Sequence, residues 1–280
     1  MTEISAALVK ELREETNVGM MECKKALVEA GGDKAKAVKI LRQRGLAIAG
    51  KKASRTAKEG QVASEVLQGG RMGVMVEVNC ETDFVARNAS FQSFLQTVLE
   101  KAKTVQGDIG EAMKSDVTAK ITEIGENIIV RRSVRYELQK QGIVASYIHF
   151  GGKVGVLLEV GCEKTETAQN DLFKETVKDI TLHIAASNPQ YLSRKDVPET
   201  VLQSEREIYA KQVVNKPANI IQKIVDGKLE KFYSLVCLVE QGFVKEPEQT
   251  ITELLALKGK ELGDALTIRR FARYQVGVQV

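Results

Sequence analysis

Two stretches of this chain, 82 residues apart, are copies of one pattern. Residues 60–81 read GQVASEVLQGGRMGVMVEVNCE and residues 142–163 read GIVASYIHFGGKVGVLLEVGCE, with twelve of the twenty-two positions identical and no gap. Ordinary composition would give about one or two identities by chance. Each copy predicts a strand, a tight turn and a second strand, because apolar residues alternate and a Gly-Gly pair supplies the positive φ that such a turn needs. The fold must therefore contain two related β-hairpins.

The segment before the first copy, residues 1–45, reads as three short helices. The second spans about 20–30, and Asp33 suits the N-cap of the third, 34–44, which Gly45 is expected to end. A core built from three such helices is marginal alone, so we expect it to depend on a neighbour or a partner.

Further helices are expected after each copy, at 89–103 and at about 172–186. Between the copies, 108–123 reads as an exposed helix and 124–132 as a turn followed by a third strand. Towards the C-terminus two amphipathic stretches each begin with a proline, which suits the first turn of a helix. They span 198 to about 214 and 217 to about 232, with the turn at Asn215-Lys216, and they are followed by an edge strand at 243–247, a short helix at 250–257 and a final strand at 268–280.

These segments predict an α+β protein of three parts. An N-terminal three-helix bundle (1–54) precedes two related subdomains, each an antiparallel sheet with a helix, at 55–140 and 141–280. The second subdomain carries a protruding antiparallel helical hairpin at 198–232. Because such a projection adds little to a core, we expect it to touch another molecule.

The connection after the first hairpin carries the strongest functional signal. Asp83 and Phe84 lie where a strand gives way to a helix. In one interpretation Phe84 fills the space under the following helix and Asp83 caps that helix. The repeat favours another, because Phe84 aligns with Glu166, and a position that must fill a core would not accept a carboxylate. On the residues alone, a core Phe84 and an exposed, functional Phe84 both stay open.

Composition excludes several classes of protein. Aromatic residues make up 5% with no Trp, so platforms that stack single-stranded nucleic acid are not expected. The net charge of +4 is too mild to indicate nucleic-acid binding by itself. We find no secretory signal and no apolar run long enough to span a membrane, so no membrane association is predicted. The four cysteines, Cys23, Cys80, Cys162 and Cys237, form no C-x-x-C pair, and reduced thiols in a cytosolic protein are expected.

No catalytic or metal-binding residue is predicted. The two histidines, His149 and His183, have no cysteine or carboxylate at ligand spacing, and a Cys80–His149 dyad has no motif to support it. Residues 45–52 nearly match the phosphate loop G-x-x-x-x-G-K-[ST], but Lys52 stands where a magnesium-binding hydroxyl is needed, and a helix precedes the segment instead of a strand.

Two functions from different classes fit these observations. A protein-interaction factor fits the duplicated scaffold, the apolar residue at Phe84 and the projecting hairpin. The alternative is an RNA-binding or ribosome-associated module, which would use the basic run 51–58 and Arg131-Arg132.

Several motifs make the chain resemble the elongation factor Ts family, the guanine-nucleotide exchange factors of elongation factor Tu. The likeness covers nearly the whole chain, and its most specific tract is Thr82-Asp83-Phe84-Val85. The other matching motifs are Leu12-Arg13 with Thr16, Gly19-Met20-Met21 with Cys23-Lys24-Lys25-Ala26-Leu27, Glu77-Val78-Asn79-Cys80-Glu81, Ile124-Gly125-Glu126-Asn127-Ile128, Tyr147 with His149, and the 198–232 hairpin.

The resemblance implies a ubiquitin-associated-like N-terminal bundle, a two-subdomain core and a protruding coiled coil. It implies that Thr82, Asp83, Phe84 and Val85 intrude beside the nucleotide site of elongation factor Tu and help to dislodge its Mg²⁺. Further partner contacts are implied for Arg13, Met20, Met21, Asn79, Ile128 and His149.

The implied protein is a bacterial-type cytoplasmic factor that needs no cofactor and binds neither nucleotide nor a specific nucleic acid itself. Binding to elongation factor Tu–GDP would release GDP and allow GTP to enter. Some members of the family continue into a C-terminal helical module with a further contact, and this sequence ends at Val280, so that contact is not expected here.

Overall fold

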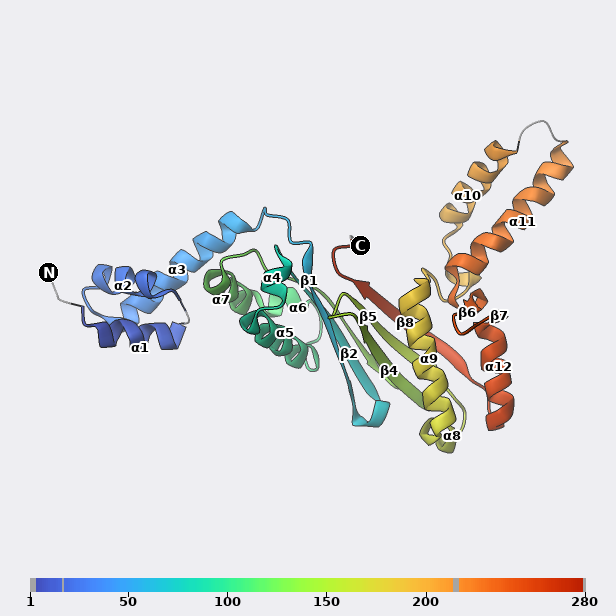
Figure 1. The fold of residues 1–280 in the computed structure, drawn as a ribbon, viewed down its shortest axis with the longest axis horizontal. Coiled ribbons are helices and arrows are strands. Elements are labelled where there is room, and N and C mark those ends of the chain that lie inside the picture. The colour runs from blue at the N-terminus through green and yellow to red at the C-terminus, as the bar shows by residue number, and fades with distance from the viewer. Residues whose placement is uncertain (1–3, 17, 214–216, 279–280) are drawn as a thin grey trace.

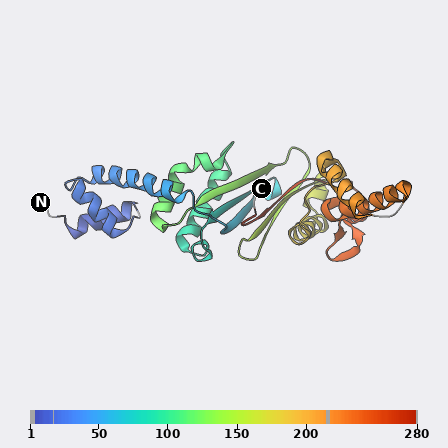
Figure 2. The same ribbon diagram turned by 90° about the horizontal axis from the view of Figure 1, so that it is seen from above.

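The computed structural model describes residues 4–16, 18–213 and 217–278. The molecule is elongated, with a helical bundle at one end, two sheets and their helices in the middle, and a pair of projecting helices at the other end (Figure 1). Seen from above, the three parts follow one another along the long axis (Figure 2). The predicted α+β class is confirmed, because helices and small antiparallel sheets both contribute to the fold.

The N-terminal bundle consists of α1 (Ala6–Thr16), α2 (Met20–Glu29) and α3 (Lys34–Lys52). Asp33 caps α3 as predicted, because its carboxylate accepts a hydrogen bond from the backbone N–H of Lys36 at 3.0 Å. The bundle has a small core of its own, formed by Val9, Leu12, Val18, Cys23, Ala26, Leu27, Ala37 and Leu41.

The predicted end of the third helix at Gly45 is wrong, because α3 continues to Lys52. Ile48 packs against the core of the first sheet, and the ammonium group of Lys52 donates a hydrogen bond to the carbonyl of Gly125. These tertiary contacts outweigh the low helix propensity of one glycine. The basic run 51–58 therefore begins inside a helix.

Each copy of the repeat forms the hairpin of one three-stranded antiparallel sheet, with the order β1-β2-β3 in the first and β4-β5-β8 in the second. A register shift falls at the same place in both, between Glu77 and Val78 and between Glu159 and Val160. The two halves are therefore alike in detail. The strands are β1 (Glu59–Leu67), β2 (Met72–Cys80), β3 (Ile129–Glu137), β4 (Gly142–His149), β5 (Val154–Gly161) and β8 (Thr267–Gln275).

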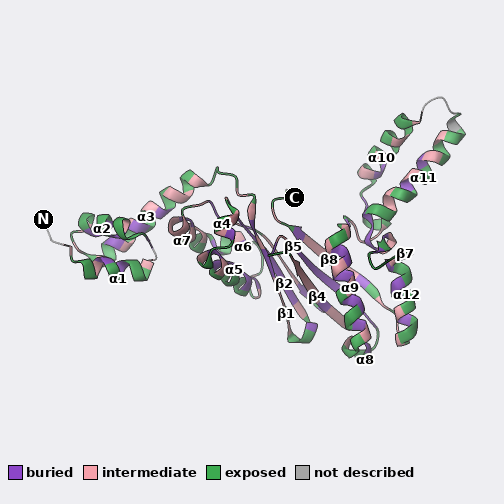
Figure 3. Cartoon of the chain, viewed as in Figure 1, coloured by how far each residue is buried: buried purple, intermediate pink, exposed green. Residues whose placement is uncertain are grey.

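Helices cover one face of each sheet, and buried residues concentrate on the strands and on the helix faces that meet them (Figure 3). Val74, Val76 and Val78 of β2 lie in one core with Phe91 of α5. The segment predicted as a single exposed helix at 108–123 is two helices that bury Ile109, Met113 and Ile121. The helices of the core are α4 (Asp83–Ala86), α5 (Ala89–Ala102), α6 (Ile109–Ala112), α7 (Lys114–Ile124), α8 (Thr165–Gln169), α9 (Asp171–Ser187) and α12 (Ile251–Leu262).

The third strands are also copies of each other, which the sequence analysis missed. Both read Arg-Arg-x-x-Arg-Tyr, at 131–136 and at 269–274, an offset of 138 instead of 82. The third arginine of each copy makes an equivalent hydrogen bond. Arg135 donates to the carbonyl of Lys103 at 2.8 Å, and Arg273 donates to the carbonyl of Ala185 at 3.2 Å. Each cation thus meets the C-terminal end of a covering helix, where helix carbonyls lack partners.

The two sheets pack face to face through a crossed set of side chains. The guanidinium of Arg132 lies 4.1 Å from the ring centre of Tyr274, and that of Arg270 lies 4.2 Å from the ring centre of Tyr136. Each arginine also pairs with a buried glutamate of its own sheet at 2.7 Å, Glu77 and Glu159 respectively. Each half therefore contributes one arginine that stacks on a tyrosine of the other half. Arg132, one of the two arginines on which the RNA-binding alternative rests, is part of this interface.

The projecting hairpin is an insertion into the second half and accounts for most of the 56 residues by which the offset between the copies grows. It consists of α10 (Glu199–Gln212) and α11 (Ala218–Val236), and the turn predicted at Asn215-Lys216 lies outside the described residues. At its root Arg194 pairs with Glu230 and Glu240, each at 2.6 Å. Nowhere in the described ranges does a helix combine the length and apolar character needed to cross a membrane.

Three C-terminal boundaries differ from the predictions. The predicted strand at 243–247 is a small hairpin of β6 (Gly242–Phe243) and β7 (Glu246–Thr250), with Pro247 inside β7. The predicted helix at 250–257 extends to Leu262, because the capping box of Thr250 and Glu253 starts it and Gly263 in the left-handed region ends it. Strand β8 ends at Gln275 instead of Val280, and 279–280 lie outside the described residues.

Gly155 should be a position where no side chain is tolerated between the sheets. A Cβ there would lie 2.4 Å from Cγ1 of Val62 and 2.9 Å from Sδ of Met75. We expect Gly155→Ala to lower the free energy of unfolding by about 1–3 kcal/mol through overpacking. The control is Gly227→Ala in α11, where a Cβ meets nothing within 4 Å and helix propensity favours alanine. Urea denaturation followed by circular dichroism measures both, and equal stabilities would contradict the packing argument.

Candidate functional site

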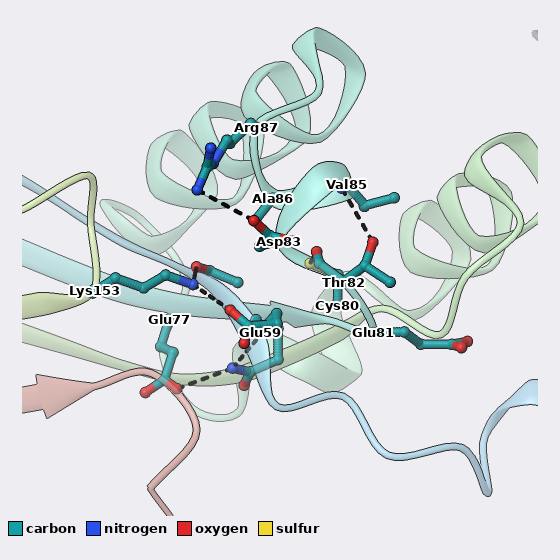
Figure 4. Close-up of polar contacts among 12 residues, drawn as sticks. Glu59, Glu77, Cys80, Glu81, Thr82, Asp83, Val85, Ala86, Arg87 and Lys153 are labelled. Atoms are coloured by element: carbon teal, nitrogen blue, oxygen red, sulfur yellow. Dashed lines mark hydrogen bonds and ion pairs between the residues drawn. The ribbon is translucent and has the colours of Figure 1, made fainter.

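The turn after strand β2 presents residues 82–85 on the short helix α4. Thr82 is the N-cap, because its hydroxyl accepts a hydrogen bond from the backbone N–H of Val85 at 3.3 Å. Asp83 is the first helical residue and pairs with Arg87 at 3.2 Å (Figure 4). The interpretation that Asp83 caps the following helix is therefore wrong. The cap is the residue before it, and the longer helix α5 is capped by Asn88.

A carboxylate from the segment between α7 and β3 fixes this turn. Glu126, just after α7, accepts hydrogen bonds from the backbone N–H groups of Glu81 and Thr82, each at 3.0 Å, and from the Thr82 hydroxyl at 2.7 Å. In return, the Glu81 carboxylate accepts a hydrogen bond from the backbone N–H of Asn127 at 2.7 Å. Charge-assisted bonds of this kind are about twice as strong as neutral ones. The backbone that leads into α4 is thus fixed to the segment between α7 and β3.

Phe84 points away from this anchored backbone. Its exposed fraction is 80%, whereas Ala86 is buried and Val85 packs against the core. The interpretation of Phe84 as a core residue is wrong, and its exposure is confirmed. An aromatic ring left in water on a rigid turn is costly to the free protein, so it suggests a surface that another molecule covers.

The second half keeps the same turn without the aromatic ring. Asp264 takes the place of Glu126 and accepts hydrogen bonds from the backbone N–H groups of Glu163 and Lys164 at 3.1 and 3.0 Å. The thiols of Cys80 and Cys162 also match, each donating to a carbonyl two residues on. The position of Phe84 is held by the exposed Glu166. The scaffold therefore needs no aromatic residue there.

His149 ends strand β4 and lies half-buried beside a second exposed aromatic residue. Its Nδ1 is 2.8 Å from the hydroxyl of Tyr147, and its ring meets that of Phe150 edge-on with the centres 4.2 Å apart. Phe150 is 81% exposed and has a φ of 33°. The sequence analysis missed Phe150, although its repeat counterpart Gln68 shows that the turn does not require an aromatic residue.

The hairpin turn that carries Phe150 is seated on the first half of the molecule. The carbonyl of Gly152 accepts a hydrogen bond from the backbone N–H of Val62 at 2.7 Å. Lys153 pairs with Glu59 and donates to the carbonyl of Gly60 at 3.3 Å (Figure 4). Strand β1 therefore fixes the His149 turn relative to the sheet that carries α4.

The predicted bundle residues are exposed, whereas two predicted partner contacts are not. Met20 and Met21 are 49% and 65% exposed on α2, and Arg13 is exposed on α1. Asn79 and Ile128, which are also predicted to contact a partner, are almost fully buried in the free chain, and those contacts stay predictions. Asn79 donates to the carbonyl of Glu59 and to the carboxylate of Glu77, and Ile128 belongs to the core of the first half. Both residues lie in the buried layer under the turn, two residues from Glu81 and from Glu126 respectively.

Neither the histidines nor the cysteines form a catalytic pair where the structure describes them. Burial raises the pKa of the Cys80 thiol to about 12, as does the nearby Glu126, so the thiol stays protonated. His183 is fully buried between Gln241 and the backbone N–H of Val244, and burial lowers its pKa. It is a packed core residue. In the described ranges no cluster of His, Cys, Asp and Glu could hold a metal ion. Residues 45–52 are helical, which is not the geometry of a phosphate loop.

These features define a duplicated α+β protein that presents two exposed aromatic residues on firmly held turns and two exposed methionines on one helix, an arrangement typical of a surface that binds another protein. The model of the family described as Elongation factor TS matches residues 81–278. An elongation factor Ts of Trichlorobacter lovleyi is 43% identical over 98% of this chain and 93% of its own length. One of Clostridium perfringens is 44% identical with the same coverage. The chain belongs to the elongation factor Ts family of translation elongation factors.

The carboxylate of Asp264 should make the stability of the protein depend on pH in the acid range. Its burial is slight and opposes ionisation, but hydrogen bonds from the Thr167 hydroxyl and from backbone N–H groups lower the pKa of Asp264 from 3.8 to about 2. A depressed pKa contributes stability above pH 3.8 that is lost as the pH falls towards 2.

We therefore expect Asp264→Asn to be less stable than the parent above pH 4, with the difference shrinking between pH 4 and pH 2. Denaturation curves across this range measure it. Asp171→Asn, at a fully exposed carboxylate, is the control. A stability difference that stays constant with pH would contradict the assignment.

Proposed function

We propose that the protein is the guanine-nucleotide exchange factor of elongation factor Tu. It binds the GDP form of that protein, dislodges the Mg²⁺, disturbs the phosphate site and releases GDP, so that GTP can bind. The observation that carries the proposal is the exposed ring of Phe84 on a turn locked by Glu126, in a chain of the elongation factor Ts family.

A wedge can weaken a metal site without touching the metal. Mg²⁺ demands near-ideal octahedral geometry, so small displacements of the groups around it lower its affinity strongly. Thr82 and Val85 hold the backbone, and Asp83 and Phe84 are presented to the partner. Because the turn is already ordered, little conformational entropy is lost when the ring enters the partner. No covalent step is required of the factor.

The proposed contact extends over three parts of the molecule. His149 with Phe150 forms a second contact, directed at the phosphate side of the nucleotide site. Met20 and Met21, with Arg13 nearby in the bundle, form a third, and a hollow of about 340 Å³ beside Met21 offers space for an apolar side chain. Asn79 and Ile128 act through the turn that they support.

Release and reuse follow from linkage. If the factor weakens nucleotide binding, nucleotide must weaken factor binding by the same ratio. Entry of GTP therefore expels the factor, and one copy can serve many partners.

The RNA-binding alternative has less support. Lys52 donates to a backbone carbonyl, and Arg132 pairs with Glu77 while stacking on Tyr274. Filter binding to RNA tests it, since a net charge of +4 should give only weak retention that salt abolishes.

Truncating the wedge should slow exchange without unfolding the protein. We expect Phe84→Ala to slow GDP release from elongation factor Tu by about tenfold or more, the cost of losing an interface hot spot. Its stability should change by no more than about 0.5 kcal/mol, because the side chain is exposed. Stopped-flow release of fluorescent GDP and thermal melting measure the two effects.

The matched control is Glu166→Ala, the same position of the other copy. It should leave the release rate unchanged. Equal rates for the parent and Phe84→Ala, or a large drop in melting temperature for Phe84→Ala, would contradict the wedge.

The factor alone should bind neither GDP nor Mg²⁺, and it should capture elongation factor Tu in a pull-down that added GDP weakens. Titration calorimetry checks the first expectation, and gel quantification of the captured protein checks the second. Tight binding of GDP to the factor itself, or capture that GDP does not affect, would argue against an exchange factor.

A further inference from the structure

Helix α3 belongs to two cores at once. Its first half contributes Ala37 and Leu41 to the core of the bundle, and its second half places Ile48 and Ala49 against the core of the first sheet. The helix is continuous between them. The bundle is therefore attached to the core by a rigid rod.

The backbone of the rod comes close to α7 at Gly45. A Cβ at this position would lie 2.8 Å from Oγ1 of Thr122 on α7 and 3.9 Å from Cγ2 of Thr118. The Thr122 hydroxyl is itself committed, because it donates to the carbonyl of Thr118 at 2.9 Å. Glycine is among the least favourable residues inside a helix, so its presence here is best explained by this close approach.

The contact is narrow, and space lies beside it. A cleft of about 710 Å³ opens between the bundle and helices α6 and α7, lined by Val18, Leu46, Ala112 and Ala119 among others. Gly45, Thr118 and Thr122 line this cleft too, so α3 has room to tilt about the contact when a side chain at Gly45 presses on Thr122. Over the roughly 16 Å from Gly45 to the start of α3, a tilt of about 10° moves the bundle by about 3 Å.

We propose that Gly45 is a positioning residue: its close contact with Thr122 sets the angle at which the bundle is carried, so that Met20 and Met21 and the Phe84 turn reach one partner together. This rests on the proposed function. Two contacts held at a fixed spacing bind more tightly than two joined by a floppy tether, because the second contact forms without a further search. The angle should therefore govern affinity for the partner, whereas the Phe84 turn governs the rate of GDP release once the partner is bound.

The principal test compares Gly45→Leu with Gly50→Leu, a glycine of the same helix where a Cβ meets nothing within 4 Å. Stopped-flow release of fluorescent GDP from elongation factor Tu is followed over a range of factor concentrations. We expect Gly45→Leu to raise the concentration for half-maximal rate about tenfold and to leave the maximal rate within about twofold of the parent. Gly50→Leu should change neither. Identical behaviour of the two variants, or a loss of maximal rate alone, would overturn the proposal.

A rescue distinguishes positioning from general damage to the fold. Gly45→Ala should weaken binding about threefold, and adding Thr122→Ala should restore it, because the remaining Cβ of residue 122 is 3.8 Å away, an ordinary contact. Failure of the second change to rescue the first would count against the contact.

A measurement on the free chain separates this inference from the proposed function. Spin labels at Lys10→Cys in α1 and Ser93→Cys in α5 report the distance between bundle and core; the native cysteines are buried. Gly45→Leu should shift or broaden this distance by about 3 Å or more, and Gly50→Leu should not. If the parent fails to release GDP, the proposed function fails while this distance still tests the angle. If the distance does not move, the angle is not set at Gly45, whatever the exchange rates.

Discussion

The crossed contact between the two sheets is the constraint on which the rest of the molecule depends. Arg132 stacks on Tyr274 while Arg270 stacks on Tyr136, and the glutamates paired with these arginines are buried. Separating the halves would break both arginine–tyrosine stacks and expose the apolar residues packed between the sheets, so movement of one half away from the other costs free energy. Because the halves are locked in this way, the turn at Phe84 and the turn at His149 keep a fixed spacing, although they lie on different sheets.

Comparison of the two copies separates the residues that the fold needs from those that it does not need. Both keep the hairpin, the carboxylate that holds the following turn and the arginine that meets the end of the covering helix. They differ in the residues that their turns expose. The first copy has Phe84 where the second has Glu166, and the second has Phe150 where the first has Gln68. Each exposed aromatic residue therefore stands on a scaffold whose other copy shows that the fold does not need it.

Rigidity is the common theme of the surfaces assigned to partner binding. Glu126 orders the turn of α4, strand β1 seats the turn after β4, and α3 joins the bundle to the core without a flexible linker. Each of these contacts is already made in the free chain. Little further conformational entropy is therefore lost when a partner binds. The wedge that we propose at Phe84 benefits from this rigidity, because a yielding wedge would deform before the metal site of its target did.

The sequence by itself determined the duplicated hairpins, the α+β class and the covering helices. The comparison of its two copies also showed that Phe84 could be either a core residue or an exposed functional residue. These follow from local periodicity, from glycine at turns and from the internal repeat. Only the tertiary structure decided that α3 runs through Gly45, that Thr82 and not Asp83 caps α4, and that Asn79 and Ile128 lie beneath the site instead of on it. It also showed that Arg132 and Arg273 serve the fold. The reason is physical: helix ends, burial and the partner of a charge are set by contacts between residues far apart in the chain, and local propensity is too weak to resist them.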